Sequence, residues 1–198
     1  TCPTFPAPLF ALPFLVRFAR IPASGFSRTR ADGRTLPMKL YDLTRTQHLP
    51  ITREQAWQFF TEPYNLLKIT PGWLDFRIVS GSGPRLYPGM IISFHVTPVF
   101  RLACLWVTEI TQVDAPHFFV DEMRFGPYRF WHHQHRFSAN ADGVTVEDII
   151  HYAVKGGPVG RLLNRFLVRP KLDEIFSFRS RTLSTLFKSE TLQTGARP

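Results

Sequence analysis

The sequence predicts an α+β domain over residues 38–188, in which a curved antiparallel sheet of six or seven strands wraps around one long C-terminal helix. Three observations predict it. A strand and two short helices come first, alternating strands then follow with no helix between them, and one long amphipathic segment ends the domain. Strands joined by tight turns pair antiparallel. The apolar stripe of a single long helix then has one place to be buried, which is the concave face of the sheet.

The first strand and the two short helices have clear local signals. Residues 39–49 alternate and are rich in strand-forming residues. Thr52 with Gln55 three residues later has the pattern of a capping box, which predicts a helix that ends before Pro63. A second short helix is expected from Pro63 to about Ile69, before the Pro71-Gly72 pair.

Six further strands follow from period-2 alternation between turn signals. They are expected at residues 74–78, 90–96, 102–113, 118–125, 128–137 and 144–154. The glycine-rich loop at residues 80–84 lacks the lysine of a phosphate-binding loop, so we interpret it as a hairpin connection.

The long helix is expected from the Gly156-Gly157-Pro158 break to about Lys188, with a bend at Pro170. Its inward stripe is predicted to be Leu162, Leu163, Phe166, Leu167, Leu172, Ile175, Phe176, Leu183, Leu186 and Phe187. Its opposite face is basic, with Arg161, Arg165, Lys171, Arg179 and Arg181.

Both ends of the chain are expected to lie outside the domain. Residues 1–37 hold six prolines and read as a disordered extension, with Met38 as a possible natural start. The apolar run from Leu9 to Phe18 is shorter than the roughly 20 residues that span a bilayer. Residues 189–198 are expected to form a disordered tail.

Composition narrows the function classes. Apolar residues make up 44% of the 198 residues, which is enough for a sizeable core. The net charge of +9 is spread along the chain without a dense run, which argues against a nucleic-acid partner. Two cysteines, Cys2 and Cys104, give no disulfide framework and favour a reducing compartment, so the cytoplasm is the expected location.

Polar side chains gather on one predicted face of the sheet. Because residues i and i+2 share a face, His133 and His135 lie on the same side of one strand, while Asp121 and Asp148 share apolar faces of its neighbours. Buried charges need partners, so a His–Asp network is expected, with Tyr152 nearby. The strand register, and therefore the pairing, stays open at this stage.

Three interpretations of this network compete. It is a structural hydrogen-bond network, a polar anchor that orients a quinone, carboxylate or phenol in a cavity, or a general acid–base pair. A zinc site formed by His133 and His135 is a weaker interpretation than these three, because no third ligand is evident. We therefore assign neither a metal nor a cofactor.

The order of elements and several short phrases resemble a known superfamily. The phrases are Trp57-Gln58-Phe59-Phe60 before Pro63 and Asn65-Leu66, Ile69-Thr70-Pro71, Asp121-Glu122-Met123, Gly126-Pro127-Tyr128, Trp131 with His133, His135 and Phe137, and Asp148 with Tyr152. They are similar to bacterial ligand-binding members of the SRPBCC or START-like superfamily, which includes the birch-pollen-allergen family and has the helix-grip fold. The resemblance covers nearly all of residues 38–188. It implies binding of lipids, quinones or polyketides, and in a minority of members cyclisation or dehydration.

We therefore expect the domain to bind or transport a hydrophobic small molecule, lipid, quinone or polyketide-like, between the sheet and the long helix. The expected binding residues are Phe76, Phe94, Trp106, Phe119, Asp121, Met123, Trp131, His133, His135, Asp148, Tyr152 and Phe176. One alternative is a cyclase or dehydratase that uses His133, His135 and Asp148, although the sequence favours a protein that is not an enzyme. Another is a membrane-peripheral protein that uses the basic helix face. The oligomeric state is not predicted.

Overall fold

The computed structural model describes residues 38–81, 83, 85–99 and 102–194. The expectations for residues 1–37 and 195–198 lie outside these ranges. The elements, in chain order, are β1 (Tyr41–Leu49), α1 (Arg53–Thr61), α2 (Pro63–Lys68), η1 (Gly72–Leu74), β2 (Arg77–Ser80), β3 (Ile91–Val99), β4 (Leu102–Asp114), β5 (Phe118–Phe125), β6 (Phe130–Asn140), β7 (Gly143–Ala153), α3 (Gly157–Leu163), η2 (Asn164–Val168) and α4 (Arg169–Thr194).

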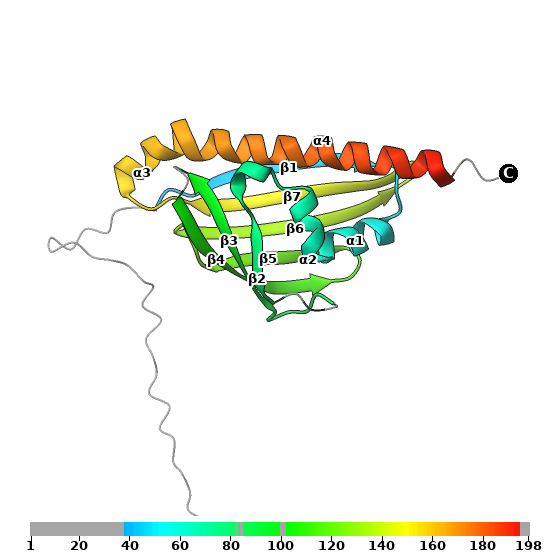
Figure 1. The fold of residues 1–198 in the computed structure, drawn as a ribbon, viewed down its shortest axis with the longest axis horizontal. Helices are drawn as coiled ribbons and strands as arrows, with labels where there is room; N and C mark the ends of the chain where they lie inside the picture. The colour runs from blue at the N-terminus through cyan, green and yellow to red at the C-terminus, as the bar shows by residue number, and fades with distance from the viewer. Residues whose placement is uncertain (1–37, 82, 84, 100–101, 195–198) are drawn as a thin grey trace, which may run out of the picture. The chain divides into compact units, whose positions relative to one another are not determined.

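The strands form one antiparallel sheet in the order β1-β7-β6-β5-β4-β3-β2. The meander from β2 to β7 is joined at its far edge by β1, which pairs with β7 along its whole length, from Tyr41 opposite Tyr152 to Leu49 opposite Val144. The long helix lies along the sheet. Helices α1 and α2 lie at the end of the sheet away from α3 (Figure 1). The predicted fold class is confirmed: this is the helix-grip architecture.

The capping box predicted at α1 is confirmed. Thr52 Oγ1 accepts from the backbone N–H of Gln55 at 3.1 Å, and Gln55 Oε1 accepts from the backbone N–H of Thr52 at 2.8 Å. The second short helix is also present, with Pro63 in its first turn. Helix α1 packs Trp57 and Phe60 against Phe137, a residue on the inner face of β6 that is 2% exposed.

One predicted strand begins later than expected. Leu74 lies in the 3₁₀ helix η1, and the left-handed backbone at Asp75, with φ of 44°, closes that turn through a hydrogen bond from its N–H to the carbonyl of Gly72. Strand β2 therefore starts at Arg77. Leu74 continues the apolar alternation of Phe76 and Ile78 in the sequence, although it lies in the 3₁₀ turn before the strand.

The C-terminal helix differs from the prediction at both ends. A π-helical turn, η2, stands directly before Pro170, whose ring lacks an N–H donor and crowds the carbonyl four residues earlier. At the other end α4 continues to Thr194, past the expected helix end at about Lys188. No glycine or proline stops the helix before Gly195.

The inward stripe of this helix is shorter than predicted. Leu172, Phe176, Leu183 and Phe187 are buried, but Leu162, Leu163 and Phe166 are exposed. The physical reason is length. The helical segment from Gly157 to Thr194 extends about 57 Å at 1.5 Å per residue, whereas the longest strand, of 13 residues, spans about 43 Å. The first helical turns therefore project beyond the sheet (Figure 1).

Three clusters of buried residues make up the core. One joins α1, β6 and β7 to the C-terminal half of α4, the second lies between β1, β6, β7 and the start of α4, and the third covers β3 and β4 next to η1. Among the described residues, no helix is long and apolar enough to cross a membrane.

Candidate functional site

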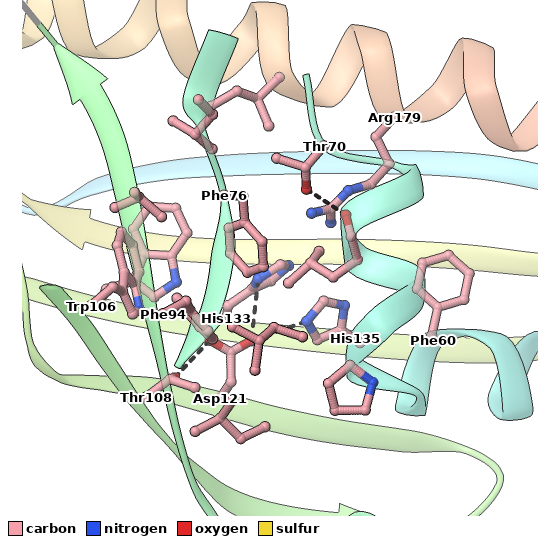
Figure 2. A pocket seen from close by; sticks show the side chains of 18 of the residues that line it. Phe60, Thr70, Phe76, Phe94, Trp106, Thr108, Asp121, His133, His135 and Arg179 are labelled. Atoms are coloured by element: carbon pink, nitrogen blue, oxygen red, sulfur yellow. Dashed lines mark hydrogen bonds and ion pairs between the residues drawn. The ribbon is translucent and has the colours of Figure 1, made fainter. Parts of the chain in front are cut away.

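A cavity of about 200 Å³ lies on the inner face of the sheet, between the three core clusters. Its wall comes from α1, α2, η1, β2 to β6 and one face of α4. Most of the lining side chains are apolar, and four charged or titratable ones, Asp121, His133, His135 and Arg179, come from β5, β6 and α4. Figure 2 shows this arrangement, with Asp121, His133 and His135 on the sheet side and Arg179 reaching in from the helix.

The structure brings together most of the residues that the sequence singled out. Nine of the twelve line the cavity: Phe76, Phe94, Trp106, Phe119, Asp121, Trp131, His133, His135 and Phe176. Asp148 does not line it, but lies directly behind the two histidines. Met123 and Tyr152 belong to the neighbouring core cluster, and Tyr152 is 0% exposed with its ring 5.4 Å from that of Tyr41. Neither side chain lines the cavity, and their expected contact with a ligand stays a prediction.

Sequence reasoning missed several lining residues. Phe60 and Thr70 come from the short helical segment, Thr108 comes from β4, and Arg179 comes from α4. Arg179 was expected on the solvent-facing side of the helix, yet it is only 8% exposed. A signal was present: Arg179 follows Phe176 by three residues and precedes Leu183 by four, which places it in the inward stripe.

The strand register that the sequence left open explains the polar cluster. Asp121 of β5 lies opposite His133 of β6, and His135 of β6 lies opposite Asp148 of β7. Each histidine therefore has one carboxylate directly across and a second one diagonally across the sheet. Cross-strand neighbours on one face are close enough to interact in both ways.

The four side chains form a closed ring of contacts. The Nε2 of His133 is 2.8 Å from Asp148 Oδ1, and its Nδ1 is 3.4 Å from Asp121 Oδ2. The Nε2 of His135 is 3.0 Å from Asp121 Oδ2, and its Nδ1 is 2.9 Å from Asp148 Oδ1 in a geometry that does not make a hydrogen bond. The two imidazole rings lie 3.8 Å apart.

Charges in this ring are set by burial and by the opposite charges around each group. Burial, followed by the charge of His135, lowers the pKa of His133. Burial also opposes the charged form of His135, but its contacts with Asp121 and Asp148 outweigh burial and raise its pKa. Burial disfavours both carboxylates as anions, yet the two histidines lower the pKa of Asp121 and hold that of Asp148 well below its usual value.

The favoured charge state is electrically balanced. The opposite directions of the two shifts favour a proton on His135 over one on His133, and with that proton the two carboxylates, His135 and the guanidinium of Arg179 sum to zero. A neutral His133 that donates from Nε2–H to Asp148 has Nδ1 on the side of Asp121. One wall of an apolar cavity thus holds two imidazoles of unequal proton affinity side by side.

The same residues are close enough to share a metal ion. The ligand atoms of Asp121, His133 and His135 lie within 4.8 Å of one another. Each imidazole is hydrogen-bonded to a carboxylate through Nε2, and Asp121 is the third candidate ligand that the sequence did not show.

The opposite part of the cavity wall is aromatic and apolar. The rings of Trp106 and Trp131 meet edge to face at 5.2 Å, and those of Phe76 and Phe94 lie 4.8 Å apart. Tyr128 closes this cluster, and burial raises the pKa of its hydroxyl, so the group remains neutral. A bound molecule would meet flat apolar surfaces here and charged groups at the other wall.

No protein-family model matches the sequence, and no curated protein matches it either. Solved structures do. Protein Ms6760 from Mycobacterium smegmatis is 17% identical with a TM-score of 0.56, covering 78% of this chain and 99% of that one. A point mutant of norcoclaurine synthase from Thalictrum flavum, in complex with a transition-state analogue, is 13% identical with a TM-score of 0.57. The match covers 79% of this chain and 99% of that one. The di-domain ARO/CYC StfQ of the steffimycin biosynthetic pathway is 10% identical with a TM-score of 0.59. The match covers 77% of this chain and 52% of that one. At these identities the likeness is one of fold, and the chain has the helix-grip fold of birch-pollen-allergen-like and SRPBCC proteins.

Proposed function

We propose that this domain binds a compact, largely apolar small molecule in the cavity between the sheet and α4. The observation that carries the proposal is the cavity itself: a largely apolar space that meets the charged cluster of Asp121, His133, His135 and Arg179 at one wall. Protein interiors are normally packed without voids of this size, so an open space lined by Trp, Phe and Ile side chains is characteristic of a binding site.

The volume narrows the class of molecule. Sites for drug-sized ligands measure roughly 300–1,000 Å³, and this cavity, at about 200 Å³, lies just below that range. A molecule with one or two rings, such as a small quinone, phenol or polyketide fragment, matches this space. A diacyl lipid would require α4 to move away from the sheet.

Native mass spectrometry of the full chain purified from cells tests the proposal. We expect an excess mass of a few hundred daltons that is lost on denaturation. Val96→Phe should abolish it, because Val96 is 4% exposed and lines the cavity, so the added ring takes the place of the ligand. Val107→Phe is the matched control, because Val107 lies between two lining residues of β4 and faces the other side of the sheet.

Two results would contradict binding in this cavity. One is a wild-type protein that carries no extra mass and gains none when it is incubated with small aromatic compounds. The other is an adduct that Val96→Phe retains at the wild-type level. An excess mass that matches a zinc ion would instead point to the Asp121, His133 and His135 cluster.

A second candidate function is acid–base catalysis on the bound molecule. It is favoured by the pairing of a protonated and a neutral imidazole on the cavity wall, since one can donate a proton while the other accepts one. Two of the structural neighbours are a synthase and an ARO/CYC protein by name. The two functions differ in what becomes of the molecule. A carrier releases it unchanged, whereas an enzyme converts it, and His133→Gln should then stop conversion while retaining binding within a few-fold.

A further inference from the structure

Arg179 is the exceptional residue of the cavity wall. The inward stripe of α4 is otherwise apolar near this point, with Phe176 and Leu183 on either side. An arginine buried to this degree is rare unless it is paired. Figure 2 shows its side chain reaching from α4 toward the two histidines rather than toward solvent.

The guanidinium is incompletely paired by the protein. Its Nε has no hydrogen-bond partner among the described residues. Its ion-pair contact, from Nη1 to Asp148 Oδ1, measures 3.8 Å, which is too long for a hydrogen bond. The guanidinium also lies 4.8 Å from the centroid of the Phe176 ring. A buried cation with open donors is costly unless a further acceptor completes its shell.

Asp148 cannot complete that shell alone. Its Oδ1 already accepts from His133 and contacts His135 at 2.9 Å. Each of these contacts is shorter than the one to Arg179, so the aspartate mainly serves the histidines. The Nε of Arg179 therefore keeps a donor without a partner among the described residues, and the Arg179 side chain lines the cavity.

We propose that Arg179 binds the carboxylate of an aromatic or other apolar acid held in the cavity, an assignment that rests on the proposed function. A guanidinium recognises a carboxylate through two parallel hydrogen bonds, with geometry that a lysine cannot reproduce. The aromatic wall formed by Trp106, Trp131 and Phe94 would hold the rings of the same molecule. Burial strengthens both parts of this recognition, because water is largely excluded.

The test compares two probes of nearly equal shape, 2-naphthoate and 2-naphthamide. Binding to the full chain is followed by quenching of tryptophan fluorescence, since Trp106 and Trp131 line the cavity. The wild-type protein should prefer the carboxylate by about tenfold or more, within the range of charge-assisted hydrogen bonds. Arg179→Met should remove this preference while changing the affinity for the amide by less than about threefold. Arg179→Lys should keep part of it.

The outcomes separate this assignment from the proposed function. If the wild-type protein binds both probes equally, or if Arg179→Met keeps the preference, Arg179 is not the carboxylate ligand although the cavity binds aromatic molecules. If neither probe binds and the cavity-filling variant Val96→Phe behaves as wild type in every assay, the binding function itself is overturned.

A separate observation concerns the start of the long helix. Val159, Leu162, Leu163 and Phe166 recur at spacings of three and four residues on one helix face, and we call them the α3–η2 apolar surface. They are 65%, 61%, 43% and 66% exposed. Contiguous exposed apolar residues of this kind mark contact sites.

The surroundings of this surface are basic and contain further apolar residues. Residues 154–170 include Lys155, Arg161, Arg165 and Arg169 and no acidic residue. The strand register places the first residues of β1 and β6 and the last of β7 at this same end of the sheet, where Leu40 and Phe130 are also exposed.

We propose that the α3–η2 apolar surface docks on an anionic lipid surface. The apolar side chains would enter the interface, and the exposed Arg161 and Arg165 would face lipid phosphates, as in interfacial helices that combine the two. The sequence suggested membrane contact through a basic helix face that included Arg179. This proposal instead uses cations at the start of the helix, because Arg179 is buried.

Vesicle flotation with the full chain tests this surface. Binding should be strong to phosphatidylcholine vesicles that contain phosphatidylglycerol, weak to phosphatidylcholine alone, and reduced by salt. Phe166→Ser should lower partitioning about tenfold or more, whereas Val79→Ser, an exposed apolar residue of β2, should leave it unchanged. Arg165→Gln should lower it about fivefold, with Arg181→Gln, exposed on α4, as its control.

Two results would overturn lipid docking. Binding that Phe166→Ser and Arg165→Gln leave unchanged would show that another part of the chain is responsible. A wild-type dimer in sedimentation that Phe166→Ser converts to a monomer would show that a second copy of the chain covers this surface.

Discussion

Asp148→Asn is expected to lower the free energy of unfolding at neutral pH by about 3–5 kcal/mol, the range for breaking a buried ion pair by removing one partner. Asp148 contacts His133, His135 and Arg179 through one oxygen, and its side chain is 9% exposed. Without its charge, a protonated imidazole and a guanidinium face Asp121 alone. The buried cluster then has an unbalanced positive charge.

Glu147→Gln serves as the matched control for this substitution. It makes the same chemical change one residue earlier in β7, on the other face of the sheet, and should change the free energy of unfolding by less than about 0.5 kcal/mol. Both variants can be compared by urea denaturation. A loss below about 1 kcal/mol for Asp148→Asn would mean that the cluster contributes little to folding and would favour a purely functional role.

Local patterns were sufficient to predict the fold. The capping box at Thr52, the alternation in residues 90–96 and the helical spacing from Leu172 to Phe187 depend on neighbours in sequence, which period and propensity describe directly. The same parity argument placed His133, His135 and Asp148 on one face, because side chains alternate strictly along a regular strand.

The parts that were missed depend on relations between distant segments. The partner of each histidine follows from the register of β5, β6 and β7, which one sequence does not specify. The exposure of Phe166 follows from a helix longer than the sheet beneath it. Arg179 was assigned by residue type to the solvent face, although its position between Phe176 and Leu183 indicated the opposite.

The pH dependence of stability should have opposite signs for the two histidines of the cluster. The pKa of His133 is lowered from 6.5, so as pH falls below 6.5 the unfolded chain takes up a proton that the folded chain refuses, and stability decreases. The pKa of His135 is raised from 6.5, so its stabilising contribution is complete below 6.5 and is lost as pH rises through the folded value. The groups that face them are Asp121, Asp148 and Arg179. The carboxylates stay ionised until pH falls below about 3.8, their ordinary pKa.

The wild-type free energy of unfolding should therefore pass through a maximum near pH 6.5, with each flank limited to about 1.4 kcal/mol per pH unit for one proton. His133→Gln should flatten the acid flank and leave the alkaline flank, whereas His135→Gln should do the reverse. Urea denaturation from pH 5 to pH 9 measures both slopes, and His132→Gln, on the other face of β6, is the control. If both variants flatten the same flank, the proton is shared between the two imidazoles rather than held by His135. The division into one proton donor and one proton acceptor on the cavity wall would then have no basis.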